Sequence, residues 1–204
     1  MKKPNKCKKV TLIVLITVLC IAALAAAGYG ANRLYIASAT PEEYMVTGEN
    51  YFDYQGNNLE CSGYASAYVI RSLGMEADGH TLYEQFENKN DDGTLAPLYL
   101  AKNLKKMGYK CRLRVGTLTD LKYHVSRGTP VIAFVKVTPF QDALHYFAVV
   151  GYDENYIYVA DSVKNRVNSA TQTLYNRKIS TDDFKVMWKD TGHLFDNIFL
   201  TIKK

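Results

Sequence analysis

The stretch Gln55-Gly-Asn-Asn-Leu-Glu-Cys61-Ser-Gly-Tyr-Ala-Ser-Ala-Tyr-Val-Ile-Arg-Ser-Leu-Gly74 carries a polar loop into a helical pattern that begins at a cysteine. One helix face after that cysteine holds Ala65, Tyr68, Val69, Ser72 and Leu73. Gly74 stands where a helix C-cap is expected. The positive end of a helix dipole favours a thiolate, so Cys61 is a candidate nucleophile. Most free cysteines are small buried hydrophobes, and position alone does not choose between the two interpretations.

The bulk composition fits one globular domain with an appendage. The chain has 204 residues, 48% of them hydrophobic, and a net charge of +5. Five lysines lie within residues 1–9, and the other twenty basic residues balance twenty acidic ones. The body of the protein is therefore neutral, and we expect no nucleic-acid partner.

An uncharged run covers residues 10–32 and follows the basic tail. About 20 apolar residues span a bilayer, and preceding lysines keep the N-terminus in the cytoplasm. We therefore expect a cytoplasmic tail (residues 1–9), a transmembrane anchor (10–32), a linker (33–50) and a domain outside the membrane (51–204). The alternative is a cleaved signal peptide and a secreted domain, because Ala25-Ala26-Ala27 satisfies an A-x-A cleavage site.

The four cysteines do not form a disulfide framework. Cys7 lies in the basic tail and Cys20 in the apolar run. Leu19 precedes Cys20 where a lipoprotein site needs a small residue, so no lipid anchor is expected. Only Cys61 and Cys111 reach the exterior, which allows one bridge at most. If Cys61 is a nucleophile it is not permanently paired, and Cys111 is then a plain strand residue.

Hydrophobic periodicity predicts an α+β fold, with helices first and a mostly antiparallel sheet after them. The expected helices begin at Cys61 or cover residues 81–88, 97–107 and 118–127, with another from residue 181 and a short helical start at 41–44. The expected strands cover 109–115, 130–137, 145–152, 156–161 and 198–202, and 162–179 is irregular or a hairpin. Residues 88–93 resemble half of a calcium loop, but Tyr99 occupies its twelfth position, which indicates a surface turn.

His145 and Asp161 are the candidate base and its orienting group. A three-residue hairpin loop at 153–155 would place Tyr152 opposite Tyr156 and Asp161 opposite Phe147, diagonal to His145. Such diagonal neighbours lie within side-chain reach. Each residue taken singly also fits an ordinary strand end. The remaining histidines, His80, His124 and His193, are expected at the surface, and no pair has metal-ligand spacing.

Taken in order, these motifs resemble a known family. They are Gln55-x5-Cys61, Leu73-Gly74, Gly128-Thr-Pro-Val-Ile, His145-Tyr-Phe-Ala-Val-Val-Gly-Tyr-Asp153, Tyr158-Val-Ala-Asp161-Ser and Phe184-x3-Trp188. Residues 50–202 resemble papain-like cysteine peptidases related to the bacteriocin-processing, double-glycine-leader peptidases. The resemblance implies Cys61 as nucleophile, His145 as base, Asp161 as its orienting partner and Gln55 as an oxyanion-hole donor, with no cofactor and no metal. The Gln55 amide and the Cys61 backbone N–H are suitable donors for such a hole.

Two departures from the family limit what is carried over. The cysteine is commonly followed by glycine, whereas here Ser62 precedes Gly63. The exporter members carry membrane and ATP-binding domains that this chain lacks, so leader-peptide processing is not implied.

The sequence therefore supports a membrane-tethered cysteine peptidase that acts on a peptide or protein. An amidase or transpeptidase with the same triad is an alternative, because an acyl-enzyme accepts amines as well as water. A tethered binding domain with a degenerate site is another. Its surface would use outward-facing hairpin tyrosines, Tyr146, Tyr152, Tyr156 and Tyr158, although these fit ordinary strand positions better. Substrate, specificity and oligomeric state are left open.

Overall fold

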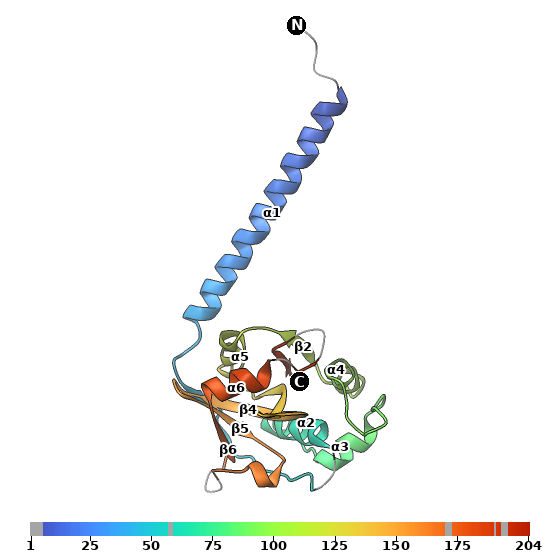
Figure 1. The fold of residues 1–204 in the computed structure, drawn as a ribbon, viewed down its shortest axis with the longest axis vertical. Coiled ribbons are helices and arrows are strands. Elements are labelled where there is room, and N and C mark those ends of the chain that lie inside the picture. Colours follow the sequence, from blue (N-terminus) through green and yellow to red (C-terminus); the bar gives the residue numbers. More distant parts are fainter. Residues whose placement is uncertain (1–5, 57–58, 170–172, 190, 193–195) are drawn as a thin grey trace. The chain divides into compact units, whose positions relative to one another are not determined.

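The chain divides into two compact units, Met1–Ala39 and Thr40–Lys204. The computed structural model describes residues 6–56, 59–169, 173–189, 191–192 and 196–204. The first unit is the helix α1 (Lys6–Ser38), drawn in blue in Figure 1. Its segment Val10–Ser38 is long and apolar enough to cross a membrane, by a criterion that a signal sequence near the N-terminus also meets.

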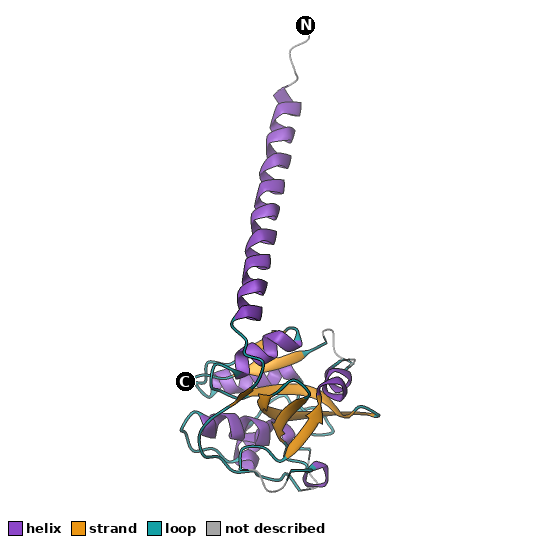
Figure 2. Ribbon diagram, turned by 90° about the vertical axis from the view of Figure 1, so that its left-hand side faces the viewer, coloured by secondary structure: helices purple, strands orange, loops and turns teal. Residues whose placement is uncertain are grey.

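The second unit is built on one antiparallel sheet with the strand order β2-β7-β3-β4-β5-β6, shown in orange in Figure 2. A short strand, β1, pairs with the end of β4. The strands are β1 (Tyr44–Met45), β2 (Arg112–Val115), β3 (Val131–Thr138), β4 (Gln141–Tyr152), β5 (Tyr156–Ala160), β6 (Arg177–Ser180) and β7 (Ile198–Thr201). The predicted α+β class is confirmed.

Side-chain caps mark the starts of three helices, and glycines follow the ends of three. They are α2 (Cys61–Ser72), α3 (Gly79–Gln85), α4 (Pro97–Lys106), α5 (Leu118–Val125) and α6 (Thr181–Trp188), with a 3-10 turn η1 (Lys164–Arg166). The side chains of Asp78, Thr117 and Ser180 cap α3, α5 and α6. The glycines expected after three helices adopt positive φ: 74° at Gly74, 93° at Gly108 and 88° at Gly128.

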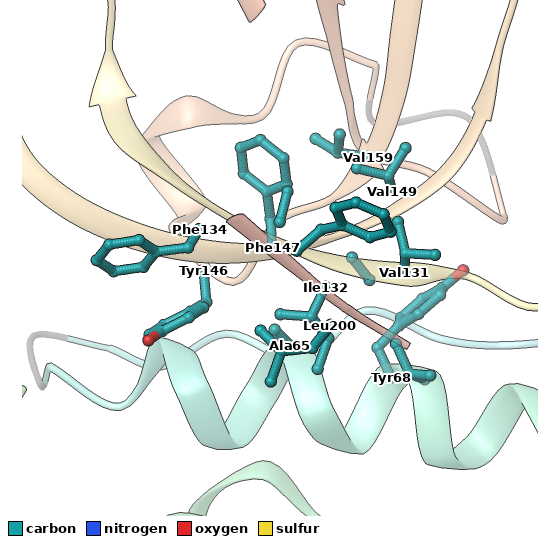
Figure 3. Packing of buried hydrophobic residues seen from close by; sticks show 14 of the residues in the cluster. Ala65, Tyr68, Val131, Ile132, Phe134, Tyr146, Phe147, Val149, Val159 and Leu200 are labelled. Atoms are coloured by element: carbon teal, nitrogen blue, oxygen red, sulfur yellow. The ribbon is translucent and has the colours of Figure 1, made fainter. Parts of the chain in front are cut away.

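The core lies on both faces of the central strands. Figure 3 shows α2 under the sheet, where Ala65 and Tyr68 approach the apolar side chains of the strands. On the opposite face, Phe184 of α6 packs against Phe147 with ring centroids 6.3 Å apart. Successive strand residues point to opposite faces, so a strand covered on both is apolar throughout. The first five residues of β3 are accordingly all buried.

The helical start predicted at residues 41–44 is wrong, because this segment pairs with the sheet. Tyr44 lies opposite Tyr152, and the Tyr152 hydroxyl donates to the Pro41 carbonyl over 3.2 Å. Gly151 permits this close approach. A Cβ there would lie 2.6 Å from Met45 Sδ. In the region predicted as irregular or a hairpin, β6 adds a strand beside β5.

The predicted turn register is wrong at the tip of the β4–β5 hairpin and correct farther along it. Tyr152 faces Ile157 rather than Tyr156. The Asp153 carboxylate accepts from the backbone N–H groups of Asn155 and Tyr156, which stabilises a longer turn. An irregularity between Val149 and Gly151 then restores the predicted pairing of residues 148–149 with 159–160.

The structure changes the assignments of the hairpin tyrosines, of His124 and of Cys111. Tyr146 and Tyr152 are buried rather than outward-facing, and Tyr156 and Tyr158 are partly buried, as strand residues are. His124 is half-buried, with its ring 5.6 Å from that of Phe199. Cys111 is buried immediately before β2 rather than within the strand, and burial raises the pKa of its thiol to about 11.

Candidate active site

His145 and Asp161 form a buried ion pair at the centre of the site. His145 Nε2 lies 2.8 Å from Asp161 Oδ1, and the two residues are 3% and 2% exposed. His145 comes from β4, and Asp161 immediately follows β5. The contact joins the two residues that the hairpin argument placed on one side of the sheet.

Cys61 is the first residue of α2 and is partly exposed. Its thiol is near enough to His145 to be among the groups that raise the pKa of that imidazole. Because Asp161 binds Nε2, His145 Nδ1 is the nitrogen left to exchange a proton with the thiol. The structure thus brings a nucleophile, a base and an orienting carboxylate into one chain of contacts.

The electrostatics of the pair favour an imidazolium beside a carboxylate. Burial by itself lowers the pKa of His145, but the Asp161 charge and the hydrogen bonds with Asp161 and Cys61 raise it to about 10. Burial by itself raises the pKa of Asp161, but the charge and hydrogen bond of His145 and the charge of Arg177 lower it to about 2. A charged imidazole is the partner that a thiolate requires.

Gln55 is buried and connected to the same segment as Asp161. Its backbone N–H donates to the Ser162 carbonyl over 3.1 Å, and Ser162 Oγ donates to Gln55 Oε1 over 2.6 Å. In this arrangement the oxygen end of the Gln55 amide faces Ser162. Residues 57–58 between Gln55 and Cys61 are outside the described residues.

Two residues that contact Asp161 were not predicted from the sequence. Arg177 Nη1 donates to Asp161 Oδ2 over 2.7 Å. The Asn176 side chain donates to the Asp161 carbonyl and accepts from its backbone N–H, both over 2.8 Å. Asn176 is fully buried, and Arg177 begins β6. The only sequence signal was an adjacent amide and cation in a stretch assigned as irregular.

Glu60 precedes the cysteine and is buried, and its Oε2 lies 3.1 Å from Nδ1 of His80. That hydrogen bond raises the pKa of His80, which is exposed as predicted. The ligand atoms of Glu60, His80 and Glu84 lie within 4.8 Å of one another, close enough to hold a metal ion, which sequence spacing did not indicate. His193 is outside the described residues.

Most of the chain matches one known family. The model of the Peptidase_C39 like family matches residues 48–194, which include Cys61, His145 and Asp161. The chain belongs to the Peptidase_C39 like family. This confirms the sequence-based prediction of a cysteine-type peptidase related to the bacteriocin-processing enzymes.

Solved structures share the fold of this Peptidase_C39 like protein at low sequence identity. A C39-like peptidase from Bacillus anthracis is 16% identical, with a TM-score of 0.59, over 80% of this chain and 98% of that one. Xylellain, a cysteine protease from Xylella fastidiosa, is 14% identical, with a TM-score of 0.60, over 83% of this chain and 88% of that one. A double glycine motif protease from an AMS/PCAT transporter is 20% identical, with a TM-score of 0.51, over 78% of this chain and 96% of that one. No curated protein matches the chain.

Proposed function

We propose that this chain is an extracytoplasmic, membrane-tethered cysteine peptidase that hydrolyses peptide bonds with Cys61, His145, Asp161 and Gln55. The observation that carries the proposal is the buried His145–Asp161 pair beside a cysteine at a helix N-terminus. The Cys61 thiolate attacks the scissile carbonyl carbon, and the imidazolium of His145 gives its proton to the leaving amine. Water, deprotonated by the neutral imidazole, then hydrolyses the thioester, and the departing sulfur and the protonated imidazole restore the thiolate–imidazolium pair.

Gln55 is the proposed side-chain donor to the oxyanion, together with the backbone N–H of Cys61. An oxyanion-hole donor is typically worth about 3 kcal/mol in the transition state. Ser162 supports this role because it binds the oxygen end of the Gln55 amide. The neighbouring segment therefore orients both the histidine, through Asp161, and the proposed oxyanion donor.

A peptide is the proposed substrate. The neighbouring double glycine motif protease was solved in complex with a leader peptide. In this chain a pocket that includes Cys61 and Ser62 is lined by apolar side chains, with Asn90 and Thr94 as its polar members. The apolar members are Leu59, Leu95, Ala96, Phe134, Leu144 and Tyr146. Such a lining suits an uncharged side chain of a peptide next to the scissile bond.

Alkylation of Cys61 by iodoacetamide tests the site without a known substrate. In the detergent-solubilised full-length chain, Cys61 should react well below the ordinary thiol pKa of about 8.5. His145→Ala should lose this low-pH reaction, and His124→Ala, which changes a half-buried histidine elsewhere, should keep it. Modification is assigned to Cys61 by peptide mass spectrometry. Titration of Cys61 near pH 8.5 in all three proteins would contradict the proposal.

The acceptor of the acyl group is tested separately. With peptides that the wild type cleaves, Cys61→Ala should be inactive. An added amine should leave hydrolysis as the main product if the enzyme is a peptidase. Amine-coupled product in excess would identify a transpeptidase with the same triad.

A further inference from the structure

Asp161 has two cationic partners, one on each carboxylate oxygen. His145 Nε2 lies 2.8 Å from Oδ1, and Arg177 Nη1 lies 2.7 Å from Oδ2. The side chains of His145, Asp161 and Arg177 are 3%, 0% and 9% exposed. The orienting carboxylate is therefore part of a buried cluster of three charged groups rather than a simple pair.

Arg177 is held in place by strand pairing and by a hydrogen bond, and the residue before it also binds Asp161. It is the first residue of β6 and lies opposite Val159 of β5. Its Nη2 donates to the Val137 carbonyl on β3 over 3.0 Å. The side-chain amide of the preceding residue, Asn176, binds the Asp161 backbone through both its oxygen and its nitrogen. The start of β6 thus binds Asp161 by its main chain and by its carboxylate.

We propose that Arg177 is a positioning residue of the peptidase, which acts through Asp161 on the protonation of the Cys61–His145 pair; this inference rests on the proposed function. A guanidinium remains charged at every pH at which the enzyme folds, and its planar fork holds a carboxylate oxygen in a fixed direction. It offsets the charge of Asp161, so that the carboxylate holds the imidazole in place without an uncompensated negative charge in the buried cluster.

The charged groups of this cluster come from different places in the fold: Cys61 from α2, His145 from β4, Asp161 directly after β5, and Arg177 from β6. The phenols of Tyr146 on β4 and Tyr83 on α3 also face Cys61, and burial raises the pKa of both, so they remain neutral. β3 contributes the uncharged Val137 carbonyl. Without the arginine, the carboxylate charge of Asp161 is no longer offset and acts fully on the imidazole and the thiol. A more negative surrounding favours the protonated thiol, so alkylation should begin at higher pH.

The test measures iodoacetamide alkylation of Cys61 against pH in the detergent-solubilised full-length chain. Arg177→Gln should raise the midpoint of alkylation by roughly one pH unit. Arg177→Lys keeps the charge and should keep the midpoint close to that of the wild type. Lys178→Gln is the matched control. It removes one positive charge from the next residue of β6, whose ammonium lies 3.7 Å from the Tyr156 ring, and should leave the midpoint unchanged.

An unshifted midpoint in Arg177→Gln would show that the arginine is only structural, whatever happens to stability. A wild-type protein without low-pH alkylation contradicts the proposed function itself, so the two failures are distinct.

If Arg177→Gln does not fold, Asp161→Asn/Arg177→Gln replaces it, because that variant leaves no buried charge of the pair unmatched. The alkylation midpoint of this double variant should lie close to that of Asp161→Asn alone. A large added shift would overturn the view that Arg177 acts through Asp161.

Discussion

Ser162 shows how one residue links two parts of the proposed catalytic machinery. It follows Asp161 directly, it is buried, and its hydroxyl binds Gln55 Oε1 over 2.6 Å. A primary amide can rotate by half a turn and exchange its oxygen and nitrogen ends. In the structure the oxygen faces Ser162, so the NH2 group faces away from it, and the hydrogen bond holds the amide in that orientation. Donor orientation in the proposed oxyanion hole therefore depends on a residue that does not contact the substrate carbonyl.

We expect Ser162→Ala to lower kcat by about tenfold with little change in KM, because the donor is present but less well oriented. Full removal of an oxyanion donor usually costs about 100- to 1000-fold in kcat, which Gln55→Ala should approach. The measurement is steady-state hydrolysis of a cleaved peptide by each variant. Equal losses in both variants, or no loss in Ser162→Ala, would contradict the orienting role.

The sequence predicted residues with distinctive chemistry in or beside regular elements. Cys61 opens a helix, His145 lies within a strand that the pattern began at His145 itself, and Asp161 follows a strand. Arg177 and Asn176 were missed because an arginine and an asparagine in an irregular stretch are ordinary surface residues. Their importance depends on how β6 pairs with β5, a long-range contact that local periodicity does not encode.

The helix α2 depends on a close contact with α3, made through two glycines. A Cβ on Gly63 would lie 2.2 Å from the Gly79 carbonyl oxygen and 2.7 Å from Tyr83 Cβ. A Cβ on Gly79 would lie 2.6 Å from the Tyr64 ring. This contact gives a reason for the sequence Ser62-Gly63. The glycine two residues after Cys61 is where a neighbouring helix approaches the nucleophile's own helix.

Gly63→Ala should destabilise the protein, and the sign of the change is informative. Alanine in a helix is favoured over glycine by roughly 0.5–1 kcal/mol, so propensity alone predicts stabilisation. The clash with backbone atoms of α3 should instead cost about 1–3 kcal/mol. Ser62→Ala is the matched control. Its hydroxyl is buried without a hydrogen-bond partner among the described residues, so the variant should be neutral or slightly stabilised. Thermal unfolding checks both, and a stabilised Gly63→Ala would refute the packing argument.

The hairpin between β4 and β5 shows why an element can be predicted better than its register. The alternation of apolar residues predicted both strands, but it did not predict the length of the turn, and the turn sets the register of the pairing. Asp153 stabilises a longer turn, and the irregularity near Gly151 then compensates the one-residue shift. The backbone pairing next to His145 and Asp161 is therefore the predicted one, whereas the pairing nearest the turn is shifted by one residue.

For the molecule as a whole, the two units differ in what holds them together. Thr40–Lys204 has a core closed on both faces of a sheet, and residues 131–135 of β3 and 145–152 of β4 are all buried. The apolar side chains of α1 are exposed along its length, including Leu12, Ile16 and Leu19. A helix that is apolar all round requires an apolar environment. Its 33 residues extend about 50 Å, more than the thickness of the hydrocarbon core of a bilayer.

We therefore expect the mature protein to keep α1 and to remain in the membrane. Cells that express the chain should yield full-length mass in the membrane fraction after an alkaline carbonate wash, and removal of residues 1–39 should release the remainder as soluble protein. Replacing Ala25 and Ala27 with leucine removes the A-x-A site and should change neither mass nor location. Protein that begins near residue 28 in the soluble fraction, lost in the leucine variant, would show a cleaved signal peptide. In that case the apolar surface of α1 would serve export alone, and the peptidase would act free of the membrane.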